Sequence, residues 1–181
     1  MSEPAFRPLP QPFAACSSRM RSPRRGSAIL ELVLALPVLL IIVLATVEFS
    51  LYFVNAQQLA LACRVGALEA AQTPSLGSLS AIPSDVITAI EHQLGSSGID
   101  ACRVRLEHNV GGTTELFHPP AAGCDCGPAT TLASPPPGEY VRLTVCAPQS
   151  ELMPNCLKLF GLDVSDPTRV VERTQVFPYE G

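Results

Sequence analysis

The sequence predicts an α+β protein in which a long N-terminal transmembrane α-helix carries a small extracytoplasmic head of one helix on an antiparallel sheet. Leu32–Val47 is an uncharged run of sixteen residues bounded by Glu31 and Glu48. Positive charge gathers before this run, and short stretches after it alternate between apolar and polar residues. We expect four parts: a leader (1–26), a span (27–54), an extramembrane continuation of the helix (55–73) and the head (74–181).

The leader is predicted to be disordered, basic and cytoplasmic. Its five prolines remove backbone donors and disfavour a helix. Five arginines against one glutamate give it a net charge of +4, whereas the rest of the chain carries −8. Basic residues beside a first span keep that end inside the cell, so the head should lie outside the cytoplasm. Met1 and Met20 are both possible starts.

The apolar run extends to Val54 and is long enough to cross ~30 Å of hydrocarbon at ~1.5 Å per residue. Pro37 removes a hydrogen bond inside the helix and is expected to kink it. Glu48 and Phe49 should mark the far membrane interface, with Glu48 as a solvated carboxylate. The alternative for Glu48 is a contact with a neighbouring helix in an assembly.

A cleaved signal peptide is the main competing interpretation of this segment. Its apolar core would span ~7–15 residues and end at a small-residue site. Here the run is longer and leads into Tyr52 without such a site. The stretch LALAC, which ends at Cys63, resembles a lipoprotein cleavage box only weakly and lies far beyond the run.

Glu31 is the more informative carboxylate, because a charge within a membrane helix is costly and usually has a partner or a function. It could simply lie in the first turn, where the helix dipole favours it. Its spacing from Gly26 suggests more. Cleavage after Gly26 would make Ser27 the new N-terminus, one helical turn from Glu31, so that the free ammonium could neutralise the carboxylate.

This arrangement resembles the processing site of type IV prepilins, and the wider segment resembles the TadE-like family of tight-adherence (Flp) pilus systems. The shared features are Arg25-Gly26, Glu31, Leu36-Pro37 and Val47-Glu48-Phe49, in that order. Leu32 departs from the tyrosine that often follows the glutamate in prepilin-like proteins. The resemblance covers about residues 24–72.

The resemblance implies a minor pilin or pseudopilin that is anchored in the cytoplasmic (inner) membrane and helps to assemble a pilus for adhesion or export. It implies a prepilin peptidase, other pilin-like subunits and an inner-membrane assembly platform as partners, besides the lipid bilayer. Glu31 would then guide subunit docking.

After the span, Leu61, Val65, Leu68 and Gln72 recur at helical spacing, so the helix should continue to Gln72 and stop at Thr73-Pro74. Its outer part is expected to pack against the head. Within the head the pattern predicts the elements that follow: a helix at 85–94, strands near 102–107, 113–118, 139–147 and 171–177, and a helical turn at 157–160.

Five head cysteines are disulfide candidates, since thiols outside the cytoplasm tend to pair. Connectivity does not follow from sequence. We favour a bond between Cys146 and Cys156, with Cys102 bonded to Cys124 or Cys126. Cys63, on the helix, is expected to be a packed, unbonded residue.

Catalysis and metal binding have little support. The spacing of His108, His118, Cys124 and Cys126 does not fit a zinc knuckle, and no nucleophile elbow, phosphate loop or metalloprotease motif occurs. The head is acidic and lacks a basic stripe. We therefore expect no enzyme activity, cofactor, metal, nucleic acid or small-molecule substrate. The alternative function is an unprocessed single-span protein whose disulfide-bonded head binds an external partner.

Overall fold

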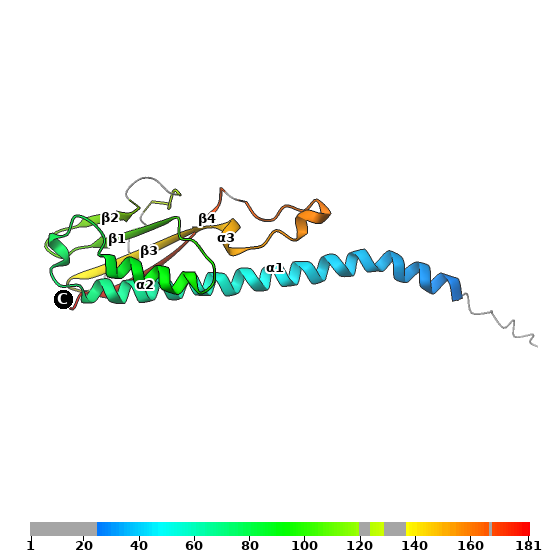
Figure 1. Ribbon diagram of the computed structural model, residues 1–181, viewed down its shortest axis with the longest axis horizontal. Coiled ribbons are helices and arrows are strands. Elements are labelled where there is room, and N and C mark those ends of the chain that lie inside the picture. The colour runs from blue at the N-terminus through cyan, green and yellow to red at the C-terminus, as the bar shows by residue number, and fades with distance from the viewer. Residues whose placement is uncertain (1–24, 120–123, 129–136, 167) are drawn as a thin grey trace, which may run out of the picture. The chain divides into compact units, whose positions relative to one another are not determined.

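The computed structural model describes residues 25–119, 124–128, 137–166 and 168–181. The chain forms two compact units, 1–37 and 38–181. The predicted disorder of the leader concerns residues that lie, up to residue 24, outside the described ones. In the first unit, the described residues belong to helix α1 (Arg25–Gln72), which continues into the second unit. Figure 1 shows the elements.

Helix α1 begins at Arg25, two residues before the predicted span, and ends at the predicted residue, Gln72. Leucine, alanine and glutamine are strong helix formers, and the hydroxyls of Thr46 and Ser50 are satisfied within the helix by the carbonyls of Val43 and Thr46. Bonding of this kind hides hydroxyls from an apolar surrounding. The helix stops before Pro74, which disfavours helical geometry at Thr73.

Four antiparallel strands form one sheet in the order β2-β1-β3-β4. Their bounds are β1 (Arg103–His108), β2 (Thr114–His118), β3 (Tyr140–Pro148) and β4 (Val170–Pro178). Between β1 and β2 the chain turns at Gly111 and Gly112, whose φ angles of 67° and 136° favour glycine. All four predicted strands are present, because successive side chains of a strand point to opposite faces of the sheet and their alternation shows in the sequence.

The core lies between one face of this sheet and two helices, the C-terminal part of α1 and α2 (Ser84–Gly95). Both helices lie on the same side of the sheet in Figure 1. The inner sheet face contributes mainly Leu106, Leu143 and Val145 to the core, and α2 contributes chiefly Val86 and Ile90. This confirms the predicted α+β arrangement of a helix on an antiparallel sheet, with α1 as a second covering helix.

Leu59 is the large side chain of α1 that is fully buried in this contact, whereas other large side chains of the helix are not. Leu61, Val65 and Leu68 are 40–46% exposed. The face packed against the sheet and α2 carries small residues, chiefly Ala62, Cys63, Gly66, Ala67 and Ala70. A Cβ on Gly66 would lie only 2.6 Å from Ile90 Cγ1 and 2.8 Å from Leu143 Cδ2, so close approach of the elements selects small residues there.

Three short helical elements complete the head. The turn predicted at 157–160 is present as η2 (Leu157–Phe160). The segment after α1 contains η1 (Leu76–Ser78), and α3 (Gln149–Leu152) follows β3 directly. Neither was predicted, because three or four residues are too few to show a periodicity.

Candidate functional site

In the first unit, the predicted processing residues all lie on α1. Gly26 and Ser27 lie in its first turn, and Glu31 follows as an exposed residue on the same helix. Glu31 is surrounded along the chain by exposed apolar residues such as Leu30, Leu32 and Val33, which are 62–70% exposed. A carboxylate in such a setting is available to a partner rather than used in the fold. The cleavage after Gly26 and the docking role of Glu31 stay predictions.

Pro37 is an internal residue of α1 and the last residue of the first unit. In the second unit, Phe49 is 50% exposed, so its ring does not form part of the core. Its predicted position at the membrane interface is compatible with this exposure. The predicted kink at Pro37 stays a prediction.

Glu48 differs most from its prediction, because its side chain is fully buried instead of solvated. Its Oε1 atom accepts a hydrogen bond of 2.8 Å from the backbone N–H of Leu157, the first residue of η2. Its Oε2 atom has no hydrogen-bond partner among the described residues. The carboxylate therefore joins α1 to a segment 109 residues later in the chain.

Asn55 makes a second polar contact on the same helix face. Its Nδ2 atom donates to the carbonyl oxygen of Leu152, at the end of α3, over 2.9 Å. Glu48 and Asn55 are seven residues apart, hence two turns along one face, and Tyr52 between them packs against the core. Sequence reasoning missed this face, although two polar residues spaced by seven in an apolar helix were a usable signal.

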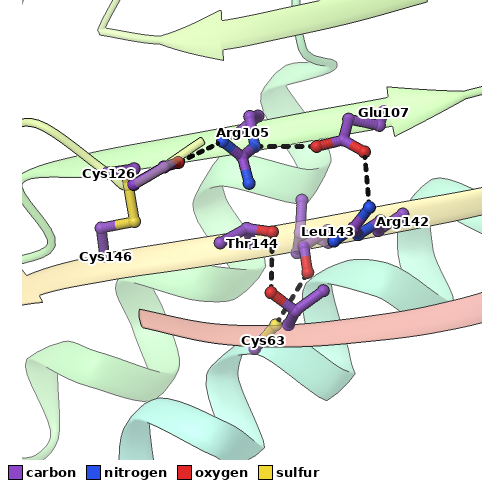
Figure 2. Close-up of polar contacts among 10 residues, drawn as sticks. Cys63, Arg105, Glu107, Cys126, Arg142, Leu143, Thr144 and Cys146 are labelled. Atoms are coloured by element: carbon purple, nitrogen blue, oxygen red, sulfur yellow. Dashed lines mark hydrogen bonds and ion pairs between the residues drawn. A yellow bond between two sulfur atoms is a disulfide. The ribbon is translucent and has the colours of Figure 1, made fainter. Parts of the chain in front are cut away.

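On the other face of the sheet, two disulfides attach residues 124–128, and Figure 2 shows the one between Cys126 and Cys146. Cys102 is bonded to Cys124, one of the two alternatives considered for it, and Cys126 is bonded to Cys146. The favoured bond between Cys146 and Cys156 is therefore wrong. Cys156 is an exposed free thiol, because it lies in the segment that contacts α1 and not beside β3.

A charged cluster lies on this sheet face, as Figure 2 shows. Arg105 Nε lies 2.8 Å from Glu107 Oε1, and Arg142 Nη1 lies 3.2 Å from Glu107 Oε2. Arg105 also donates from Nη1 to the carbonyl oxygen of Gly127 over 2.8 Å. Arg105 and Arg142 are each 5% exposed. The cluster therefore joins strands β1 and β3 through Glu107 and joins β1 to Gly127 through Arg105.

Two titratable groups of the core have shifted pKa values. Burial lowers the pKa of His108, which points from β1 into the core. Burial also raises the pKa of the Cys63 thiol to about 12. Cys63 lies beyond the predicted span and donates to the carbonyl oxygens of Leu143 and Arg173 at 3.2 and 3.1 Å. As predicted, it is a packed and unbonded residue. A thiol held in this protonated form is a poor nucleophile.

The zinc ligands considered from the sequence are not available as a set. Cys124 and Cys126 are in different disulfides, and His108 is buried on the opposite sheet face. Within the ranges that the structure describes, no group of three or more histidine, cysteine, aspartate or glutamate residues is placed to hold a metal ion.

By length and composition, one helix in the described chain fits a single-pass membrane anchor, namely α1 from Ile29 onward. Residues 26–68 match the family model described as TadE-like protein. No similar protein was found among curated proteins, and no similar fold among solved structures. Apart from Arg25, the matched segment contains the residues on which the sequence resemblance rested, among them Gly26, Glu31, Pro37 and Glu48.

Proposed function

From the premise that residues 26–68 are TadE-like, we propose that this chain is a minor pilin or pseudopilin of a tight-adherence (Flp) pilus system. The family match suggests a membrane protein associated with such a pilus. The finer proposal is a subunit that helps to initiate, cap or support pilus assembly, for adhesion or export. The match over the apolar helix is the observation that carries it.

The distribution of burial along α1 supports a membrane anchor. From Ile29 to Val47 the side chains are exposed or half-buried, and almost all are apolar. Nineteen helical residues suffice for about 28 Å of hydrocarbon. Glu48, the next residue, is the first one fully covered by the head. We infer that the bilayer begins where this cover ends, with the N-terminus in the cytoplasm and the head outside it.

The proposed mechanism is assembly through contacts, without chemistry on a substrate. Glu31 is exposed within an apolar stretch, so burying it in a bundle of helices requires a partner charge. The N-terminal ammonium of Ser27, released by a prepilin peptidase acting after Gly26, would supply that charge in the same or a neighbouring subunit. Other pilin-like subunits and an inner-membrane platform would be the partners.

The test of processing is the intact mass and N-terminal sequence of protein extracted from the membrane. We expect a chain that begins at Ser27. A chain that retains the leader, combined with normal pili in a deletion strain, would instead support a single-span protein whose head binds an external partner.

The test of docking is the variant Glu31→Ala. It should insert into the membrane at the wild-type level but abolish pili, because the ammonium loses its partner. Glu69→Ala is the matched control, since Glu69 is an exposed carboxylate on α1 beyond the predicted span, and it should leave pili intact. Normal piliation in Glu31→Ala would exclude the docking role.

A further inference from the structure

Residues 153–163, here called the lobe, expose apolar side chains beside α1. Leu159 is 85% exposed, the highest value among the large hydrophobic residues that the structure describes, and Leu162 is 48% exposed. An exposed leucine alone means little, but two within four residues, on a segment that contacts a membrane helix, need an explanation.

The lobe has a defined conformation. Leu152, Met153 and Leu157 are buried and anchor it, and Gly161, with a φ of 77°, closes η2 by donating to the carbonyls of Leu157 and Lys158. Leu162 N–H donates back to Leu157 as well. Leu159 and Leu162 therefore point outward from a fixed turn and not from a loose loop.

The position of the lobe along α1 follows from its contact with Glu48. The Leu157 N–H bonded to this carboxylate sets η2 at the level where the exposed apolar stretch of the helix ends. In Figure 1 the orange turn of η2 lies beyond the end of the sheet. If the apolar stretch is in lipid, Leu159 and Leu162 lie at the level of the outer membrane interface.

We propose that the lobe is a second membrane contact of this protein, in which Leu159 and Leu162 dip into the headgroup region of the bilayer that α1 crosses. Lys158, whose side chain is 70% exposed, would reach lipid phosphates from the same turn. Its neighbour Asp163 is 3.9 Å away and also exposed, so this ion pair is open to solvent and weakly held. The lipid surface is favoured as occupant because the patch continues the apolar surface of the anchor.

The chain contains no tryptophan, so single tryptophans can report depth in the intact protein. We would compare Leu159→Trp with Leu40→Trp, in the span, and with Leu79→Trp, an exposed leucine after η1 that serves as the control outside lipid. Each protein is reconstituted in phosphatidylcholine and phosphatidylglycerol vesicles that carry quencher-labelled lipid, with the label either near the headgroup or deep in the acyl chain.

We expect Leu159→Trp to be quenched about twofold by the shallow label, as for an interfacial anchor, and Leu40→Trp to be quenched by the deep label. Leu79→Trp should be quenched by neither. Leu162→Trp provides a second reporter if substitution at 159 perturbs the turn.

This inference rests on the membrane span of the proposed function, and the series separates the two. If Leu40→Trp is quenched while the tryptophans at 159 and 162 behave like the one at 79, the lobe lies in water or against another protein and the inference is wrong. If Leu40→Trp is also unquenched, the span itself fails. The outcome does not depend on pilus formation.

Discussion

At the residue scale, Glu48 shows how a carboxylate can be kept at the end of an apolar run without facing water. The backbone N–H of Leu157 supplies a hydrogen bond, and burial removes the competing solvent. A hydrogen bond to a buried acceptor adds only modestly to the free energy of unfolding. Leaving its partner unsatisfied lowers that free energy by about 1–3 kcal/mol. Glu48 thus holds the lobe against α1 and is not a solvated carboxylate.

Glu48→Ala should loosen the lobe, because the Leu157 N–H loses its acceptor. Lys158 is the single lysine of the chain, so a lysine-specific protease cuts the protein at one site, within the lobe. A loss of about 1–3 kcal/mol corresponds to roughly 5-fold to 150-fold faster cleavage in detergent solution when opening is in fast equilibrium.

Glu48→Gln is the matched variant, since its amide oxygen still accepts from Leu157. Its cleavage rate should stay close to that of the wild type. Equal rates for all three proteins would show that the hydrogen bond does not hold the lobe.

The sequence alone could not predict this contact. It identified Glu48 as unusual, and the apolar context made solvation at the interface the simplest interpretation. The actual partner is a backbone N–H 109 residues away, and a backbone donor leaves no trace in side-chain pattern. For the cysteines the obstacle is similar, because spacing does not give connectivity. Burial of Cys63 was predictable, since alanine and leucine surround it.

At the element scale, helix α1 packs through its small residues. The sequence predicted the length of α1, the position of α2 and the four strands, since these follow from the spacing of apolar residues and from residues that end a helix or a strand. It did not identify the packed face, because the periodicity of the large residues Leu61, Val65 and Leu68 marks a face that is exposed, while small residues make the contact. The packed face is decided by how closely α1 approaches α2 and the sheet, as the short distances at Gly66 show.

Gly66→Ala should destabilise the head although alanine favours the helix by about 0.5–1 kcal/mol. The new Cβ would meet Ile90 and Leu143, which are 1% and 0% exposed and have little room to move. Overpacking of this kind typically costs about 1–3 kcal/mol, so the net change should be a loss. The midpoint of thermal unfolding in detergent measures it.

Gly95→Ala is the control for this variant, since Gly95 ends α2 and nothing lies within 4 Å of the position that a Cβ would take there. Its midpoint should be unchanged or slightly higher. A Gly66→Ala protein as stable as the wild type would show that the helix can shift away from α2 and the sheet.

At the scale of the whole molecule, two disulfides attach residues 124–128 to the outer sheet face. They join residues 22 and 20 positions apart. Closing loops of this size stabilises a fold by about 3 kcal/mol each, chiefly by restricting the unfolded chain. The charged cluster of Arg105, Glu107 and Arg142 depends on this attached segment to remain buried.

Cys126→Ser should therefore lower the thermal midpoint of the oxidised protein, by an amount that corresponds to about 3 kcal/mol. Cys156→Ser should leave it unchanged, because Cys156 is free and exposed. The reverse result would support the bond between Cys146 and Cys156 that the sequence favoured. Peptide mapping without reduction identifies the bonded pairs directly.

The packed face of α1 also determines where the head can be separated from the membrane anchor. The outer part of α1 belongs to the same hydrophobic core as the sheet. It contributes Leu59, Ala62, Cys63, Ala67 and Ala70 to that core. A proteolytic cut after Gln72 would leave these residues with the anchor and expose the apolar sheet face. Release of a folded head from the membrane therefore requires a cut before Leu59, so that the outer part of α1 stays with the sheet.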